Sequence, residues 1–183
     1  MAYSIALLRG INVSGKNKIR MADLKALFEG LGCESVTTYL QSGNVVYHAP
    51  KTVSAKSIEQ AIQNQLGLDV PVLTLTADTL THISQNNPFL NSDEAEPAQC
   101  YVTFLWDSPS QTSLAELTLP QNDTGRISIS DNCIYVHCPN GYGRTKIHNV
   151  FFEKKLRLLA TTRNWKTVNA LLEISAESEE HRA

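Results

Sequence analysis

Hydrophobic positions in the first half of the chain follow two spacings, one typical of strands and one typical of helices. Apolar residues at i, i+3, i+4 and i+7 from Leu24 to Leu31 predict an amphipathic helix. Ser54 is a suitable cap for a second helix that carries Ile58 and Ile62. The predicted elements are strands at 3–9, 35–40, 44–49 and 70–76 and helices that end at Gly32 and Gly67.

The second half has a similar pattern. Its predicted elements are strands at 99–106, 126–130 and 133–138 and helices at 111–117, 148–157 and 164–174, while a short helix at 78–85 precedes the boundary between the halves. A polar, proline-bounded stretch, NNPFLNSDEAEP, separates the halves and favours a domain boundary. We therefore predict a domain at 1–86, a linker at 87–97 and a second domain at 98–183.

These orders predict an α+β fold. The first half has the order βαββαβ, which is typical of a ferredoxin-like domain. The second half has the order βαββαα, so it is a second α/β unit of related design. The similarity is compatible with a structural duplication, although no residue-level repeat is visible.

Composition places the chain among globular proteins, with 42% hydrophobic residues in 183. No apolar stretch approaches the ~18 residues of a membrane helix, and MAYSIALLRG lacks the basic start of a signal peptide. The four cysteines, Cys33, Cys100, Cys133 and Cys138, show no C-x-x-C spacing. We expect reduced thiols, a cytoplasmic location, no membrane association, no metal site and no cofactor.

The net charge of -2 hides a strong segregation of charge. Residues 57–125 contain nine acidic residues and no Lys or Arg, whereas 9–25 and 144–166 hold twelve of the sixteen basic residues. Solvated helix faces account for many of these lysines. The basic residues beside glycines are harder to explain in that way.

The segment GINVSGKN, residues 10–17, differs by one position from a phosphate-binding P-loop, G-x-x-x-x-G-K-[ST]. Asn17 replaces the hydroxyl that would hold Mg²⁺, and the helical pattern begins only near Met21. We therefore do not expect a P-loop. Glycines that allow positive φ explain Gly10 and Gly15, but not the polar residues around them.

In a βαββαβ sheet the end of the first strand and the turn between the second and third strands share one end of the sheet. Residues 9–17 should therefore lie beside residues 41–44, near the positive end of the first helix. This placement predicts an anion site. Its expected ligand-binding residues are Arg9, Gly10, Asn12, Gly15, Lys16, Asn17, Gln41, Ser42, Gly43 and Asn44.

The second half contains another basic glycine segment, PNGYGRTK at 139–146. Glycine turns can present backbone N–H groups to an anion, and arginine binds phosphate or carboxylate with two donors. Thr162 and Asn164 are mainly suited to capping the last helix, while Arg163 at a helix start opposes the helix dipole. The expected ligand-binding residues here are Gly143, Arg144, Lys146, Thr162, Arg163 and Asn164.

The segments RGINVSGKN, QSGN, GYGRTK and TTRN, taken in order, resemble the bacterial family called domain of unknown function 1697. Ser14 stands where that family commonly has Gly, and Arg20 stands where it commonly has Pro. The resemblance implies a two-part α+β fold of ferredoxin-like character. It implies no activity.

Three hypotheses about function remain open. The first is binding of a phosphorylated small molecule or nucleic acid at the basic glycine loops between the two halves. The second is an enzyme acting on such a ligand, although the five scattered histidines form no recognisable nucleophile–base pair. The third is a structural or interaction protein whose polar loops only join the halves, which requires Arg9, Gln41, Arg144 and Arg163 to be buried.

Overall fold

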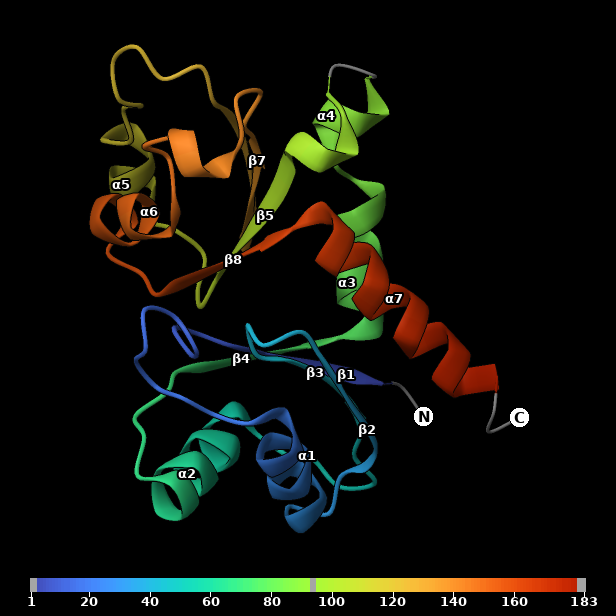
Figure 1. The fold of residues 1–183 in the computed structure, drawn as a ribbon. Coiled ribbons are helices and arrows are strands. Elements are labelled where there is room, and N and C mark those ends of the chain that lie inside the picture. Colours follow the sequence, from blue (N-terminus) through green and yellow to red (C-terminus); the bar gives the residue numbers. More distant parts are fainter. Residues whose placement is uncertain (1–2, 93–94, 181–183) are drawn as a thin grey trace. The chain divides into compact units, whose positions relative to one another are not determined.

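The computed structural model describes residues 3–92 and 95–180, which form an α+β protein with two four-stranded antiparallel sheets (Figure 1). The chain divides into two compact units. The first comprises Met1–His82 and Asn169–Ala183, and the second comprises Ile83–Val168.

The first sheet has the strand order β2-β3-β1-β4, and all of its neighbouring strands are antiparallel. Its unit contains β1 (Ser4–Leu8), α1 (Met21–Gly30), β2 (Glu34–Tyr39), β3 (Asn44–His48), α2 (Ala55–Leu66) and β4 (Val72–Thr76). Helices α1 and α2 cover one face of this sheet (Figure 1). Their buried side chains include Leu24, Phe28 and Ile62, which pack against Ala6, Val45 and other strand residues in one apolar core.

The ends of α2 are those predicted from the sequence. The hydroxyl of Ser54 accepts a hydrogen bond from the backbone N–H of Ser57 at 3.1 Å, and Gly67 closes the helix with φ +67°. A residue in the left-handed backbone conformation often follows the last turn of a helix. Glycine is common there because it adopts this conformation without steric cost.

The second sheet has the order β6-β7-β5-β8, again with antiparallel neighbours. Its strands are β5 (Cys100–Leu105), β6 (Arg126–Ser130), β7 (Cys133–His137) and β8 (Ala160–Asn164). The remaining helices of the chain are α3 (Ala77–Gln85), α4 (Pro88–Asn91), η1 (Pro97–Gln99), α5 (Gln111–Ala115), η2 (Tyr142–Arg144), α6 (Asn149–Leu156) and α7 (Trp165–Glu180), and the boundary between the two units falls within α3 and α7. Phe152 and Leu156 of α6 pack against Ile134 and Val136 of β7 in a second core.

Strand β8 corrects the predicted order βαββαα of the second half, which is βαββαβα. The segment Thr161–Asn164 looked like the start of the last helix because Thr and Asn are common caps. β-Branched Thr also favours strands, and here residues 160–164 pair with Tyr101–Leu105 of β5. The last helix begins at Trp165, directly after the strand.

Candidate functional site

Residues 12–17 form a small hairpin within the loop between β1 and α1. Val13 and Lys16 pair as an antiparallel bridge, and the N–H of Lys16 donates to the carbonyl of Val13 at 3.0 Å. Ser14 and Gly15, at the turn, have φ +50° and +76°. Two successive positive φ values are typical of a type I′ turn. We call residues 12–17 the N-terminal hairpin; this closed turn is not a P-loop cradle.

Asn12 anchors the base of the N-terminal hairpin through three hydrogen bonds. Its amide nitrogen donates to the carbonyls of Ile19 at 3.0 Å and Gln41 at 2.8 Å, and its oxygen accepts from the N–H of Ile19 at 2.9 Å. Asn17 adds a bond to the carbonyl of Gly10 at 3.2 Å. The structure therefore brings residues 9–17 and 41–44 together, and uses Asn12 to hold them.

The turn between β2 and β3 is fixed in the same way. The carbonyl of Gly43 accepts from the N–H of Leu8 at 2.8 Å, and a Cβ on Gly43 would lie 2.7 Å from the Cβ of Leu8. Asn44 is fully buried, and its amide donates to Tyr39 O at 2.7 Å and Ser42 Oγ at 3.0 Å. Gly43 and Asn44 are thus structural, whereas Gln41 and Ser42 are exposed.

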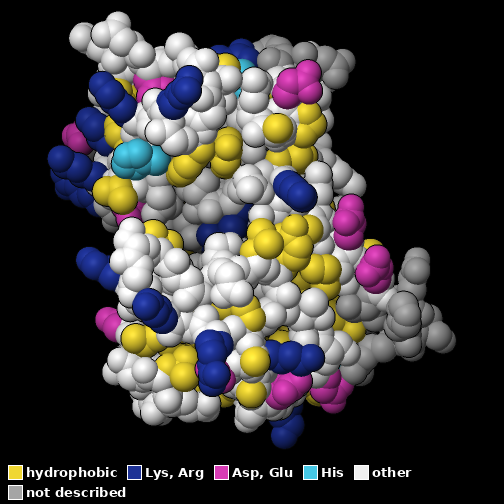
Figure 2. All heavy atoms as spheres, in the orientation of Figure 1, with side chains coloured by type: hydrophobic (Ala, Val, Ile, Leu, Met, Phe, Trp, Pro, Cys, Tyr) yellow, Lys and Arg dark blue, Asp and Glu magenta, His cyan; other side chains and the backbone are white. Residues whose placement is uncertain are grey.

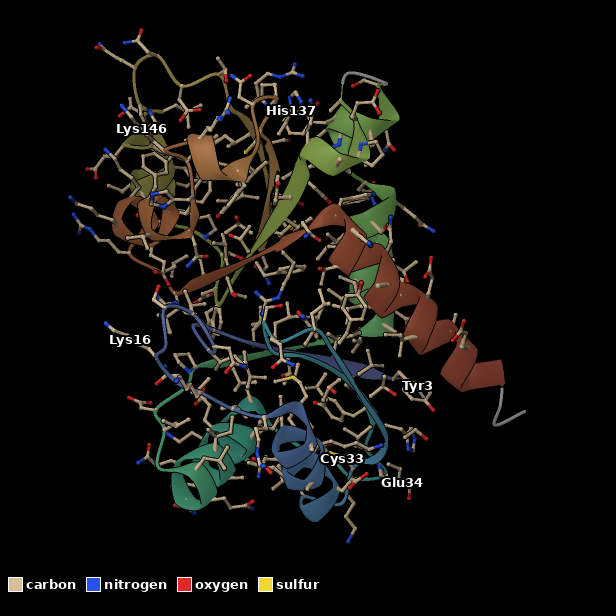
Figure 3. The ribbon with its side chains drawn as sticks, viewed as in Figure 1. Tyr3, Lys16, Cys33, Glu34, His137 and Lys146 are labelled. Atoms are coloured by element: carbon tan, nitrogen blue, oxygen red, sulfur yellow. The ribbon has the colours of Figure 1, made fainter. Side chains whose placement is uncertain are left out.

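The cations of this region differ in accessibility. Arg9 is half-buried, and Arg20 forms an exposed ion pair with Asp23 at 2.8 Å. Lys16 extends outward from the N-terminal hairpin (Figure 3), and its ammonium has no hydrogen-bond or ion-pair partner among the described residues. Lys16 is therefore accessible to an anion, as is Lys18, which is also exposed.

In the second unit, the loops before β6 and after β7 enclose a cavity of about 300 Å³. We call it the Asp123 cavity. Its lining residues are Asn122, Asp123, Thr124, Gly125, Cys138, Asn140, Gly141, Arg144, Thr145 and Lys146.

Asp123 holds the two loops of this cavity together. Its carboxylate accepts hydrogen bonds from the N–H groups of Lys146 at 2.6 Å and Gly125 at 2.8 Å, and from the hydroxyl of Thr145 at 3.0 Å. Desolvation opposes ionisation, but these bonds and the Lys146 charge outweigh it and lower the pKa of Asp123 below its ordinary value. The backbone donors that we expected to meet an external anion therefore meet Asp123 instead.

Two cations border the Asp123 cavity. Arg144 and Lys146 are exposed, and within residues 3–92 and 95–180 their side chains have no hydrogen-bond or ion-pair partner. The backbone that carries them is supported by Tyr142, whose ring lies 4.6 Å from that of Tyr101 and whose hydroxyl accepts from Asn149 N at 3.0 Å. Gly143 is exposed in the short helix η2. The cations are therefore accessible on a supported loop.

The residues expected at 162–164 have internal partners. Thr162 Oγ1 lies 2.8 Å from Thr103 Oγ1, and Asn164 Oδ1 accepts from Thr167 N at 2.8 Å in the first turn of α7. Arg163 is buried in β8, and its guanidinium donates to Thr161 Oγ1 at 2.7 Å. Burial lowers the pKa of Arg163 to about 10, so the side chain stays charged at neutral pH. These three residues support the fold.

Sequence reasoning missed Asp123, Thr145 and Asn140. The signal for Asp123 was present, because Asn122-Asp123-Thr124-Gly125 is a typical turn sequence in which Asp bonds to nearby backbone N–H groups. Its second contact, with residues 145–146, is long-range and has no local signature. Among the described residues, no group of three or more His, Cys, Asp or Glu side chains is arranged to hold a metal ion. No described helix is long and apolar enough to cross a membrane.

Comparison with known proteins places the chain in a family. The family model described as "Protein of unknown function (DUF1697)" matches residues 1–135. The chain belongs to the DUF1697 family. The match includes the N-terminal hairpin and the turn at 41–44, whereas the segments at 141–146 and 161–164 lie beyond the matched range.

A solved structure shares the DUF1697 fold seen here. It is described as a conserved bacterial protein, SP0830, from Streptococcus pneumoniae, with a TM-score of 0.65 and 22% sequence identity. The alignment covers 94% of this chain and 98% of that chain. No curated protein matches the sequence. At this identity the likeness concerns the fold alone.

Proposed function

We propose that this DUF1697 protein binds a phosphorylated or otherwise anionic ligand at the Asp123 cavity. The observation that carries the proposal is the pair of exposed cations, Arg144 and Lys146, which border the cavity. Among the described residues their side chains have no hydrogen-bond or ion-pair partner, although Lys146 interacts electrostatically with Asp123. A guanidinium offers two parallel donors to a phosphate, and an ammonium adds a point charge.

Asp123 shapes the chemistry of this ligand. Its negative charge is already compensated by three donors, so it repels an incoming anion less than a bare carboxylate does. The ligand's anionic group is expected at Arg144 and Lys146. Its uncharged polar groups then meet Asn122 and Asn140, whose amides both donate and accept.

A small ligand fits these observations better than a nucleic acid. Broad nucleic-acid binding uses a continuous basic surface, and Figure 2 shows the Lys and Arg side chains of the face in view in several separate groups. A cavity of about 300 Å³ lies at the lower end of the size range of small-molecule sites. Nucleic acid therefore remains the second class of ligand to test.

The structural alternative is favoured for the region around the N-terminal hairpin. Asn12 donates its amide hydrogens to the carbonyls of Ile19 and Gln41, and Asn44 donates to Tyr39 O and Ser42 Oγ. We therefore propose that Gln41 and Lys16 are exposed side chains there that a ligand can reach. In the second unit Arg163 also has a structural role, because it is buried and donates to Thr161 Oγ1 and Thr162 O. For catalysis, the cavity offers charge stabilisation by Arg144 and Lys146 but no recognisable nucleophile–base pair.

We also propose two broader assignments. The shared strand orders β2-β3-β1-β4 and β6-β7-β5-β8, both fully antiparallel, support a ferredoxin-like arrangement in each unit. Four free, buried cysteines support a reducing, cytoplasmic location.

The test is a thermal-shift screen of wild type and of an Arg144→Ala, Lys146→Ala variant against nucleotides, sugar phosphates, inorganic phosphate and short RNA and DNA. A ligand at 100 times its Kd stabilises the native state by about 2.7 kcal/mol. We expect a shift with wild type that the variant loses. The matched control, Lys51→Ala with Lys154→Ala, removes two exposed cations elsewhere and should keep the shift. Equal shifts in all three proteins, or no shift with any compound, contradict the proposal.

A further inference from the structure

Each sheet has two edge strands, and the corresponding edges β2 and β6 are built differently. In β2 the register against β3 shifts between Glu34 and Thr37, and Ser35 has φ +50°. Such a bulge interrupts the row of backbone groups that another strand would need. The edge at β2 is therefore protected against pairing.

Strand β6 lacks this protection. Its five residues pair with β7 in continuous register from Arg126 to Ser130, with no bulge and no proline. Within the part of the chain that the structure describes, Ile127–Ser130 have no hydrogen-bond partner other than β7. The outward N–H and C=O groups of this edge are therefore open to another strand.

The sequence of β6 identifies the strand that fits. Ile127-Ser128-Ile129 is the same in both directions, so a second copy running antiparallel places Ile127 opposite Ile129 and Ser128 opposite itself. Directly opposite residues share a face, and Ile127 already packs against the core of the second unit. Ile129, which is 38% exposed, would be covered by Ile127 of the second copy. The apolar and polar faces of the two sheets then continue without a register conflict.

Charge also favours the antiparallel arrangement. Arg126 is the only charged residue of β6 and would lie opposite Ser130 of the second copy. A parallel, in-register pair would instead place the two Arg126 side chains beside each other, which is destabilising. We propose that β6 pairs with β6 of a second copy of this chain, about a twofold axis at Ser128, to form a continuous eight-stranded sheet.

The pairing involves one short strand from each chain, so the dimer is expected to be weak and concentration-dependent. Sedimentation velocity over a range of concentrations should show a monomer–dimer equilibrium for wild type. Ile129→Lys puts a charge on the edge and should weaken dimerisation at least tenfold. The matched control Thr37→Lys changes an exposed residue of β2 and should leave dimerisation unchanged. A wild type that stays monomeric at every concentration overturns the proposal.

Engineered cysteines test the register directly. On the twofold axis, Ser128→Cys places two thiols on directly opposed residues, whose Cα atoms lie about 4.5–5.5 Å apart in an antiparallel sheet. Ser130→Cys on the same strand is four residues out of register, which corresponds to about 14 Å. Mild oxidation should cross-link the first variant and not the second, and circular dichroism should show that both are folded. The native cysteines are buried, so they add little background. Equal cross-linking of both variants, or of neither, contradicts the pairing.

Discussion

The two units share a strand order but not the position of their basic glycine loops. In the first unit the loop follows β1, whereas in the second it follows β7, which corresponds to β3. Because β1 and β3 are antiparallel, these positions lie at opposite ends of the respective sheets. The similar scaffold therefore carries different sites, and the two loops are not repeats of one design.

The corresponding ends of the two sheets share one backbone hydrogen bond. In the first unit Leu8 N donates to Gly43 O at 2.8 Å, and in the second Leu105 N donates to Asn132 O at 2.9 Å. Both bonds join the end of a central strand to the neighbouring hairpin turn. The first unit then adds Asn12, which holds a long loop there, whereas in the second the hydroxyl of Ser108 donates to Asn132 Oδ1 at 2.6 Å. The same junction supports a long loop in one unit and a short one in the other.

The largest loss of stability is expected from Gly43→Ala, which adds a methyl group at this junction in the first unit. The new Cβ would lie 2.7 Å from Leu8 Cβ and Ile11 Cδ1, on a residue with φ +82°. Overpacking and backbone strain together should lower the free energy of unfolding by about 3 kcal/mol in urea denaturation. Gly32→Ala is the control, because its φ is +83° with nothing within 4 Å, and it should cost about 1 kcal/mol. Equal losses would contradict the close packing.

A smaller loss is expected for Asn12→Ala, which removes three hydrogen bonds at the base of the N-terminal hairpin. We expect a loss of about 2 kcal/mol, since the Ile19 backbone groups and the Gln41 carbonyl lose their partner. Asn17→Ala removes one bond and should cost about 0.5–1 kcal/mol. Urea denaturation of both variants measures the difference. A reversed order would mean that Asn12 is not the anchor.

In the second unit the corresponding test is the pH dependence that Asp123 confers. The pKa of Asp123 is lowered in the folded state, so its contribution is full above the unfolded pKa of about 3.9 and is lost as pH falls through the folded pKa. Asp123→Asn should cost about 1 kcal/mol at pH 7 and almost nothing once the wild-type carboxyl is protonated. Denaturation midpoints of both proteins between pH 7 and pH 2 measure this convergence. A constant difference between the two proteins across this pH range would show that Asp123 does not contribute to the pH dependence of stability.

The smallest effect is expected from thiol reagents on the native protein. Desolvation raises the pKa of Cys133 to about 11 and that of Cys138 to about 11, and all four cysteines are buried. Iodoacetamide at pH 8 should leave the native chain unmodified, whereas in denaturant mass spectrometry should find four additions. Cys138 lines the Asp123 cavity, so its rapid labelling in the native state would show that the reagent reaches this thiol through the cavity.

Local signals explain which parts of the fold were predictable. Helix α2 has a capping serine, an apolar stripe and a closing glycine, and each acts within a few residues of the helix. Strand β8 was missed because Thr and Asn suit both a helix cap and a strand, and the choice depends on pairing with β5, about 60 residues earlier. The proximity of Asn12 and Gln41 was predictable from the order of strands and helices in the first half, and not from the identity of either residue.

The site was only partly predictable for the same reason. The glycines and cations predicted an anion-binding loop. Residues 145–146 do bind an anionic group, which is the carboxylate of Asp123 in the same chain. A sequence pattern identifies hydrogen-bond donors. It does not determine whether an acceptor in the same chain already accepts their hydrogen bonds. Arg163 shows the opposite case, since burial in β8 gives a structural role to a residue that looked like a ligand clamp.

The N-terminal hairpin has a practical consequence for studying the protein in solution. Its tip, at Ser14 and Gly15, is exposed, while Asn12 and Asn17 close the loop beneath it. Exposed loop tips accept inserted segments with little loss of fold. A short peptide tag or a fluorophore introduced between Ser14 and Gly15 would therefore report on the neighbourhood of Gln41 and Lys16 without disturbing the sheet that carries them.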